Sequence, residues 1–63
     1  MHANRFYRLY FIDSHGHITG TSDATCPGDE HACSLAIKLF AAHDSRKHKI
    51  EVWEGARMVF RYP

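Results

Sequence analysis

The sequence lacks most of the features that identify a function directly. It has only two cysteines, a formal net charge of +1 and no hydrophobic run long enough to cross a bilayer. So small a net charge argues against strong nonspecific binding of the whole molecule to a polyanion. There is no glycine-rich phosphate loop, no pair of catalytic carboxylates and no cofactor motif. These absences predict a non-enzymatic protein without a cofactor.

Length and cysteine content limit the class of protein further. With 63 residues, we expect a single small domain (1–63) whose one hydrophobic core leaves a thin margin of stability. Cys26 and Cys33 fit either free thiols or one short disulfide. The first residues contain no apolar core of a signal peptide. We therefore expect a cytoplasmic protein with reduced cysteines.

Hydrophobic periodicity predicts four strands and one helix. The period is close to 3.6 from about residue 29 to 43, where Asp29 can cap the helix. The apolar stripe of this helix consists of Ala32, Cys33, Ala36, Ile37, Leu39 and Phe40. The period is two in residues 5–13, 17–22, 48–54 and 58–62. Turns are predicted at Gly16 and Gly55.

The order of these segments predicts an α+β fold of the type β-β-α-β-β. A right-handed crossover from the second strand to the third places the third beside the first. The result is an antiparallel sheet of order 2-1-3-4 with the helix on one side. Alternation then assigns these side chains to the helix: Tyr7, Leu9, Phe11, Ile18, Ile50, Val52, Met58 and Phe60. The opposite side receives Phe6, Arg8, Tyr10, Lys49, Glu51, Trp53, Arg57, Val59 and Arg61.

Two segments carry a resemblance to a known group. Residues 7–13 (YRLYFID) with Gly16, His17 and Ile18, and residues 50–57 (IEVWEGAR), flank an alanine-rich helix that follows an acidic cap. In these segments the chain resembles a family of short uncharacterised bacterial proteins, a domain of unknown function. The resemblance implies a small bacterial protein with a domain of unknown function, and it supplies no catalytic residues.

The uncovered side of the sheet is the main candidate for a binding site. It combines aromatic and basic side chains: Phe6, Arg8, Tyr10, Lys49, Trp53, Arg57 and Arg61. Exposed aromatic side chains are enriched at the centres of protein interfaces, which predicts self-association as a homodimer or contact with another protein. Rings interleaved with cations can also bind single-stranded nucleic acid through stacking and phosphate contacts. The second interpretation is the alternative function.

Metal and nucleophile chemistry have weaker support. Cys26, His31 and Cys33 are potential zinc ligands, but their spacing differs from the paired Cys-x2-Cys motif. His31 and Cys33 would point in directions about 200° apart on a helix. His15 and His17 flank Gly16 and could bind a metal only with a third ligand, and His43 is a further candidate. Ser14 belongs to no recognisable catalytic arrangement, and neither does a thiol–base pair of Cys33 and His43. We therefore expect neither a metal site nor an enzyme.

Overall fold

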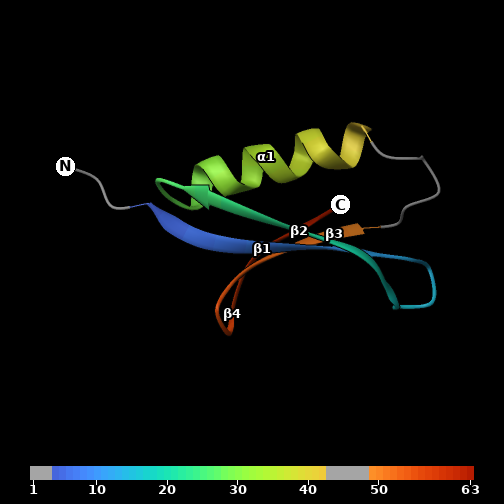
Figure 1. Cartoon of the computed structure of the whole chain (residues 1–63). Helices are drawn as coiled ribbons and strands as arrows, with labels where there is room; N and C mark the ends of the chain where they lie inside the picture. Colours follow the sequence, from blue (N-terminus) through green and yellow to red (C-terminus); the bar gives the residue numbers. More distant parts are fainter. Residues whose placement is uncertain (1–3, 43–48) are drawn as a thin grey trace.

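The structure, a computed structural model, describes residues 4–42 and 49–63. These residues form an antiparallel sheet of order β2-β1-β3-β4, and one helix lies across one side of it (Figure 1). The α+β architecture and the strand order confirm the prediction. Position 43, where the helix was expected to end, lies outside the described residues. In chain order the elements are β1 (Arg5–Ile12), β2 (Ile18–Cys26), α1 (Asp29–Ala42), β3 (Lys49–Glu54) and β4 (Arg57–Tyr62).

The turn between β1 and β2 is closed by the side chain of Asp13. Its Oδ1 accepts hydrogen bonds from the backbone N–H groups of His15 (2.8 Å) and His17 (2.9 Å). Gly16 adopts φ = 81°, a left-handed conformation that glycine accepts without steric cost. Gly55 has φ = 58° in the turn between β3 and β4. Both glycines therefore occupy the predicted turns.

The hydrophobic core lies between α1 and the central strands. Tyr7, Leu9, Ile50 and Val52 are fully buried, and Phe11 is 4% exposed. On the helix the fully buried residues are Ala32 and Ala36. Their small side chains lie one turn apart and let the helix backbone approach the sheet closely. Within the described residues, no helix is long and apolar enough to cross a membrane.

Two β-bulges move side chains away from their predicted positions. The first shifts the register between β1 and β2 at Thr19, so Ile18 pairs with Ile12 and is 57% exposed. Ile18 therefore lies on the uncovered side, and its predicted place under the helix is wrong. The second bulge, at Val59, puts Met58 opposite Trp53 while Val59 packs against the core. The predicted sides of Met58 and Val59 are thus reversed, because an extra residue breaks the alternation of the strand.

The apolar stripe of the helix also differs from the one that its periodicity predicts. Ile37 is 39% exposed, whereas Leu35, which the predicted stripe omits, packs against the core with Leu39 and Phe40. The stripe is therefore rotated toward Leu35 along the line of Ala32 and Ala36. Ile37 does not belong to the buried core.

Truncation to alanine should destabilise the protein by different amounts at Leu9, which is buried, and at Ile37, which is exposed. We expect Leu9→Ala to lower the free energy of unfolding by about 2–5 kcal/mol, because it leaves a cavity beneath the helix. Ile37→Ala should cost less than about 1 kcal/mol, because the side chain already contacts water. Urea denaturation followed by circular dichroism measures both values. Equal losses for the two variants would contradict this description of the core.

Candidate functional site

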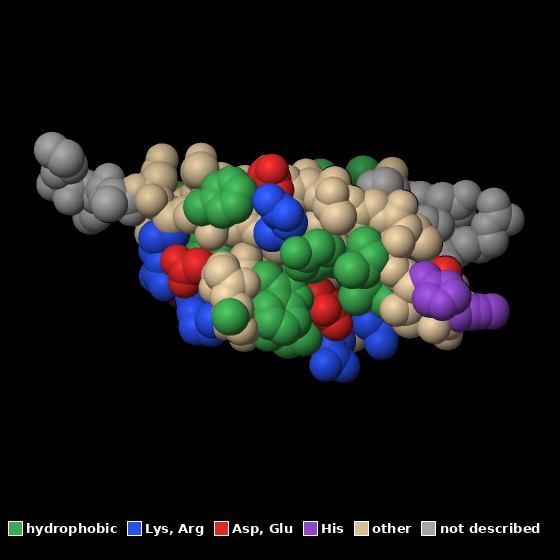
Figure 2. Space-filling view, turned by 60° about the horizontal axis from the view of Figure 1, so that its bottom comes forward, with side chains coloured by type: hydrophobic (Ala, Val, Ile, Leu, Met, Phe, Trp, Pro, Cys, Tyr) green, Lys and Arg blue, Asp and Glu red, His purple; other side chains and the backbone are tan. Residues whose placement is uncertain are grey.

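The side of the sheet away from α1 is the candidate site, called here the open face. Figure 2 looks toward this side and shows hydrophobic side chains gathered near its middle, with basic and acidic side chains among and around them. The strand pairings define its members, since residues opposite each other point to the same side. These are Phe6, Arg8, Tyr10, Ile12, Ile18, Thr21, Asp23, Thr25, Lys49, Glu51, Trp53, Met58 and Arg61.

Aromatic and aliphatic side chains give the open face its apolar character. Phe6 is 51% exposed at one end of β1, and Ile18 is 57% exposed at the other end of the β1–β2 pair. Trp53 is half-buried, and its indole N–H donates to Glu51 Oε1 at 3.1 Å. Ile12 is buried although it lies outside the core cluster beneath the helix. The open face thus carries apolar side chains along its length, several of them partly in contact with water.

Both arginines on the open face are paired with carboxylates of the same face. Arg8 Nε lies 2.9 Å from Asp23 Oδ1, and its guanidinium sits 5.9 Å from the centre of the Phe6 ring. Arg61 Nε lies 3.7 Å from Glu51 Oε2. Each of these cations therefore has a carboxylate on the same face. The face presents apolar surface with nearly balanced charge rather than a basic groove.

Arg57 does not belong to the open face, contrary to the prediction. It pairs with Glu54 across the turn between β3 and β4, and both side chains point toward the helix. The bulge at Val59 accounts for the error, because it moves every residue between it and the turn to the other side. Arg57 Nη2 lies 2.6 Å from Glu54 Oε1 and 3.1 Å from Asp29 Oδ1.

These contacts form part of a polar group that we call the junction cluster: Arg5, Tyr7, Asp29, Glu54 and Arg57. Arg5 donates to both carboxylate oxygens of Glu54, at 2.8 and 2.7 Å. The buried Tyr7 donates its hydroxyl to Asp29 Oδ1 at 2.7 Å. The cluster joins β1, β3 and β4 to the first residue of the helix, with two arginines balancing two carboxylates.

The hydrogen bonds of the junction cluster shift the pKa values of its members. Burial, together with the hydrogen bond to Asp29, raises the pKa of Tyr7 to about 12. Hydrogen bonds from Arg5 and Arg57 lower the pKa of Glu54 to about 2. Hydrogen bonds from Arg57 and Tyr7 hold the pKa of Asp29 below its usual value. The cluster is therefore stable as a neutral phenol with two carboxylates and two guanidinium groups over a wide pH range.

Sequence reasoning missed this cluster, although two signals were available. Arg5 has the same parity in β1 as Tyr7 and Leu9, so alternation places it on the helix side. A buried tyrosine usually needs a partner for its hydroxyl, and an acidic residue at the start of the covering helix is such a partner. The contribution of Arg57 had no signal, because its position depends on the bulge.

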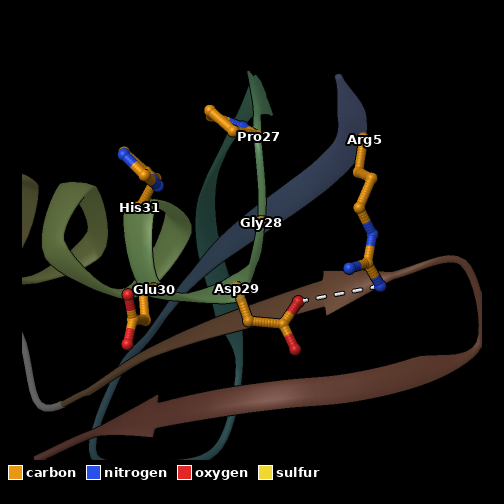
Figure 3. A pocket seen from close by; sticks show the side chains of 6 residues that line it. All are labelled: Arg5, Pro27, Gly28, Asp29, Glu30 and His31. Atoms are coloured by element: carbon orange, nitrogen blue, oxygen red, sulfur yellow. Dashed lines mark ion pairs between the residues drawn. The ribbon is translucent and has the colours of Figure 1, made fainter. Parts of the chain in front are cut away.

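A shallow hollow of about 350 Å³ lies beside the junction cluster (Figure 3). It is lined by Arg5, Pro27, Gly28, Asp29, Glu30 and His31. Figure 3 shows Arg5 directed toward Asp29, with which it forms an ion pair of 3.9 Å, while Glu30 and His31 project from the helix. Two carboxylates at the helix start disfavour an anion there, and the one cation is already paired. The hollow therefore carries no assignable ligand.

The cysteines and His31 are potential metal ligands by residue type, although the sequence predicts no metal site. Cys26 is buried at the end of β2, His31 is exposed and Cys33 is half-buried, and both thiols are free. Burial, with the charges of Asp29 and Glu30, raises the pKa of the Cys33 thiol and so makes it a poorer nucleophile. Across residues 4–42 and 49–63, no three His, Cys, Asp or Glu side chains gather in a group that could hold a metal ion.

The paired histidines lie in the turn that follows β1. His15 and His17 place their ring centres 6.3 Å apart, and Nδ1 of His17 lies 4.0 Å from Asp13 Oδ2. The side chain of His17 is 80% exposed. Asp13 holds the turn through the backbone N–H groups of His15 and His17, so these residues have a structural role. His43, the remaining candidate ligand, lies outside the described residues.

The raised pKa of Tyr7 predicts a loss of stability in alkali. The phenol must stay protonated to donate to Asp29. Its contribution to the free energy of unfolding is therefore fully present below pH 10 and is lost as the pH rises through about 12. Urea midpoints measured over this range should fall for the native chain. Tyr7→Phe should flatten that part of the profile, whereas Tyr10→Phe should preserve it. A profile that Tyr7→Phe leaves unchanged would disprove this role.

Glu54 predicts the corresponding loss of stability in acid. Because its pKa is lowered, the contribution of Glu54 to the free energy of unfolding is fully present above pH 4.5 and is lost as the pH falls through about 2. Glu54→Gln should make the unfolding midpoint less dependent on pH across this interval. Glu30→Gln is the matched control, because Glu30 is an exposed carboxylate of the first helical turn. Identical acid profiles for the two variants would refute the assignment.

Comparisons of the chain with family models, with curated proteins and with solved structures find no match. The resemblance to short uncharacterised bacterial proteins therefore stays a prediction from the sequence.

Proposed function

We propose that the protein is a non-enzymatic interaction module that pairs with a second copy of itself through the open face. The observation that carries this proposal is the placement of apolar side chains on the side of the sheet that the helix leaves uncovered. Within the described residues, Phe6, Ile18 and Ile37 are the exposed large hydrophobic side chains, and the first two lie on the open face. Burial of such surface is the main favourable term in protein association.

The indole of Trp53 supports pairing with a protein surface. Its N–H is already bonded to Glu51, so covering the ring by a partner would leave no unsatisfied donor. Burial of an unsatisfied donor costs roughly 1–3 kcal/mol, and that penalty is avoided here. Trp53 is therefore suited to be the central anchor of an interface, a role in which tryptophan is enriched.

The charge pattern also favours a second copy over a polyanion. Arg8 and Arg61 each lie beside a carboxylate of the same face, Asp23 and Glu51. A face that carries both signs can complement itself across a two-fold axis. On a nucleic acid, Asp23 and Glu51 would repel phosphates, and Arg57 is turned toward the helix. Single-stranded nucleic-acid binding remains the alternative that the experiment below also tests.

Pairing would also raise the stability of the protein, because a domain of this size has a small hydrophobic core. A domain of this size often needs a disulfide, a metal or oligomerisation for stability. Both cysteines are free, which removes an internal disulfide as the source of that stability. Pairing with a second copy would bury further apolar surface. The free thiols also support our proposal of a reducing, cytoplasmic location.

Dilution followed by amide NMR and sedimentation tests the proposal. Between millimolar and micromolar protein, the signals of the open-face residues in β1 and β3 should shift as the dimer dissociates. Trp53→Ala and Phe6→Ala should each weaken dimerisation, with Trp53→Ala costing on the order of tenfold or more in Kd. Lys49→Ala should have a smaller effect, because a charge at the rim contributes little to affinity.

Ile37→Ala is the matched control, since it removes an exposed aliphatic side chain from the helix instead of the open face. It should leave the dimer unchanged. Shifts caused by a short oligonucleotide at low salt, with steep salt dependence and no response to dilution, would replace the proposal by the nucleic-acid alternative. No response to either dilution or the oligonucleotide would defeat both functions.

A further inference from the structure

The two outer strands of the sheet differ in their protection against pairing with another chain. An outer strand exposes unpaired backbone N–H and C=O groups, and proteins guard it with charged side chains, prolines and bulges. β4 carries Arg57 and Arg61, contains the bulge at Val59 in its middle and is followed by Pro63. These features protect the unpaired side of β4 along its whole length against pairing with another chain.

β2 has little of this protection. Its nine residues contain no proline, lysine or arginine, and their single charge is Asp23. Arg8 on the neighbouring strand lies 2.9 Å from that carboxylate. The bulge at Thr19 is near the start of β2 and leaves residues 20–26 in regular register. Within the described part of the chain, β2 pairs with β1 alone, so its other side offers a long row of backbone groups.

Symmetry, charge and the length of the strand together favour one register for pairing with a second β2. In an antiparallel pair, opposite residues point to the same side of the sheet, so a two-fold axis must pass through a pair of identical residues. An axis at Asp23 would place two like charges opposite each other, which is destabilising. An axis at Ser22, the middle of the strand, places Asp23 opposite Thr21 of the second copy and Gly20 opposite Ala24. That register overlaps all nine residues of β2, with the bulge at Thr19 lying opposite Thr25 of the second copy, and it contains no like-charged pair.

We infer that β2 is a second self-association site, at which two copies join edge to edge through antiparallel β2 strands centred on Ser22. The occupant is the same strand of another copy. Pairing of this kind fuses two sheets into one of eight strands, with both helices on the same side and both open faces on the other. This site is independent of pairing through the open face, because the contacts are backbone hydrogen bonds along the sheet edge.

The test is made in the Phe6→Ala, Trp53→Ala double variant, in which pairing through the open face is removed. Sedimentation over a concentration series should still detect a dimer. Amide hydrogen exchange should show protection at every second residue of 20–24 at high concentration, and this protection should disappear on dilution. A double variant that stays monomeric, or exchange without the alternating pattern, would overturn the inference.

Position 21 tests the register within that background. Thr21→Asp places a new carboxylate opposite Asp23 of the second copy on both sides of the axis, and should weaken the association about fivefold. Thr21→Lys is the matched variant: it puts an opposite charge beside the same carboxylate and should keep or strengthen the dimer. Thermal unfolding of each variant at high dilution confirms that the monomer fold is intact. Equal weakening by both substitutions, or no effect of either, would refute the pairing centred on Ser22.

Discussion

The carboxylate of Asp29 accepts hydrogen bonds from two groups that come from distant parts of the chain. One is the hydroxyl of Tyr7 in β1, and the other is the guanidinium of Arg57 at the start of β4. Because Asp29 is the first residue of α1, these bonds fix where the helix begins above the sheet. Ala32 and Ala36 then carry the helix close against Leu9, Ile50 and Val52. This attachment holds the helix over the side of the sheet that carries the core, and the opposite side stays uncovered.

The same attachment explains how charge is distributed over the molecule. Arg5 and Arg57 are held on the helix side by Glu54 and Asp29, so they do not add to the positive charge of the open face. The arginines that remain there lie beside Asp23 and Glu51. Both sides of the sheet are therefore close to electrical balance. What distinguishes the open face is its apolar surface, and this is why a second copy is a better partner than a polyanion.

The sequence predicts the existence of the four strands, the helix, the topology and most of the open face, because each depends on local periodicity or on turn chemistry at Gly16 and Gly55. The predicted end of the second strand at residue 22 is wrong, because β2 continues to Cys26 by pairing with β1 up to Arg5. The errors at Ile18, Met58, Val59 and Arg57 share one cause. A bulge inserts a single residue and reverses the side of its neighbours, and nothing in the local pattern marks Thr19 or Val59 as the extra residue. The periodicity of the helix includes Ile37 in the apolar stripe and omits Leu35. Only the packing of the helix on the sheet shows that Leu35 contacts the core and Ile37 does not.

The strand order 2-1-3-4 has a consequence for how the chain reaches this structure. β1 with β2, and β3 with β4, are hairpins of neighbouring segments, and such hairpins form in about 1–10 μs. The central β1–β3 pair instead joins strands separated by β2 and the whole helix. Closing so long a loop costs entropy before any contact repays it. We therefore expect the meeting of the two hairpins to limit the folding rate, so that truncation of Leu9, which lies opposite Val52 in that pair, slows folding more than truncation in β4.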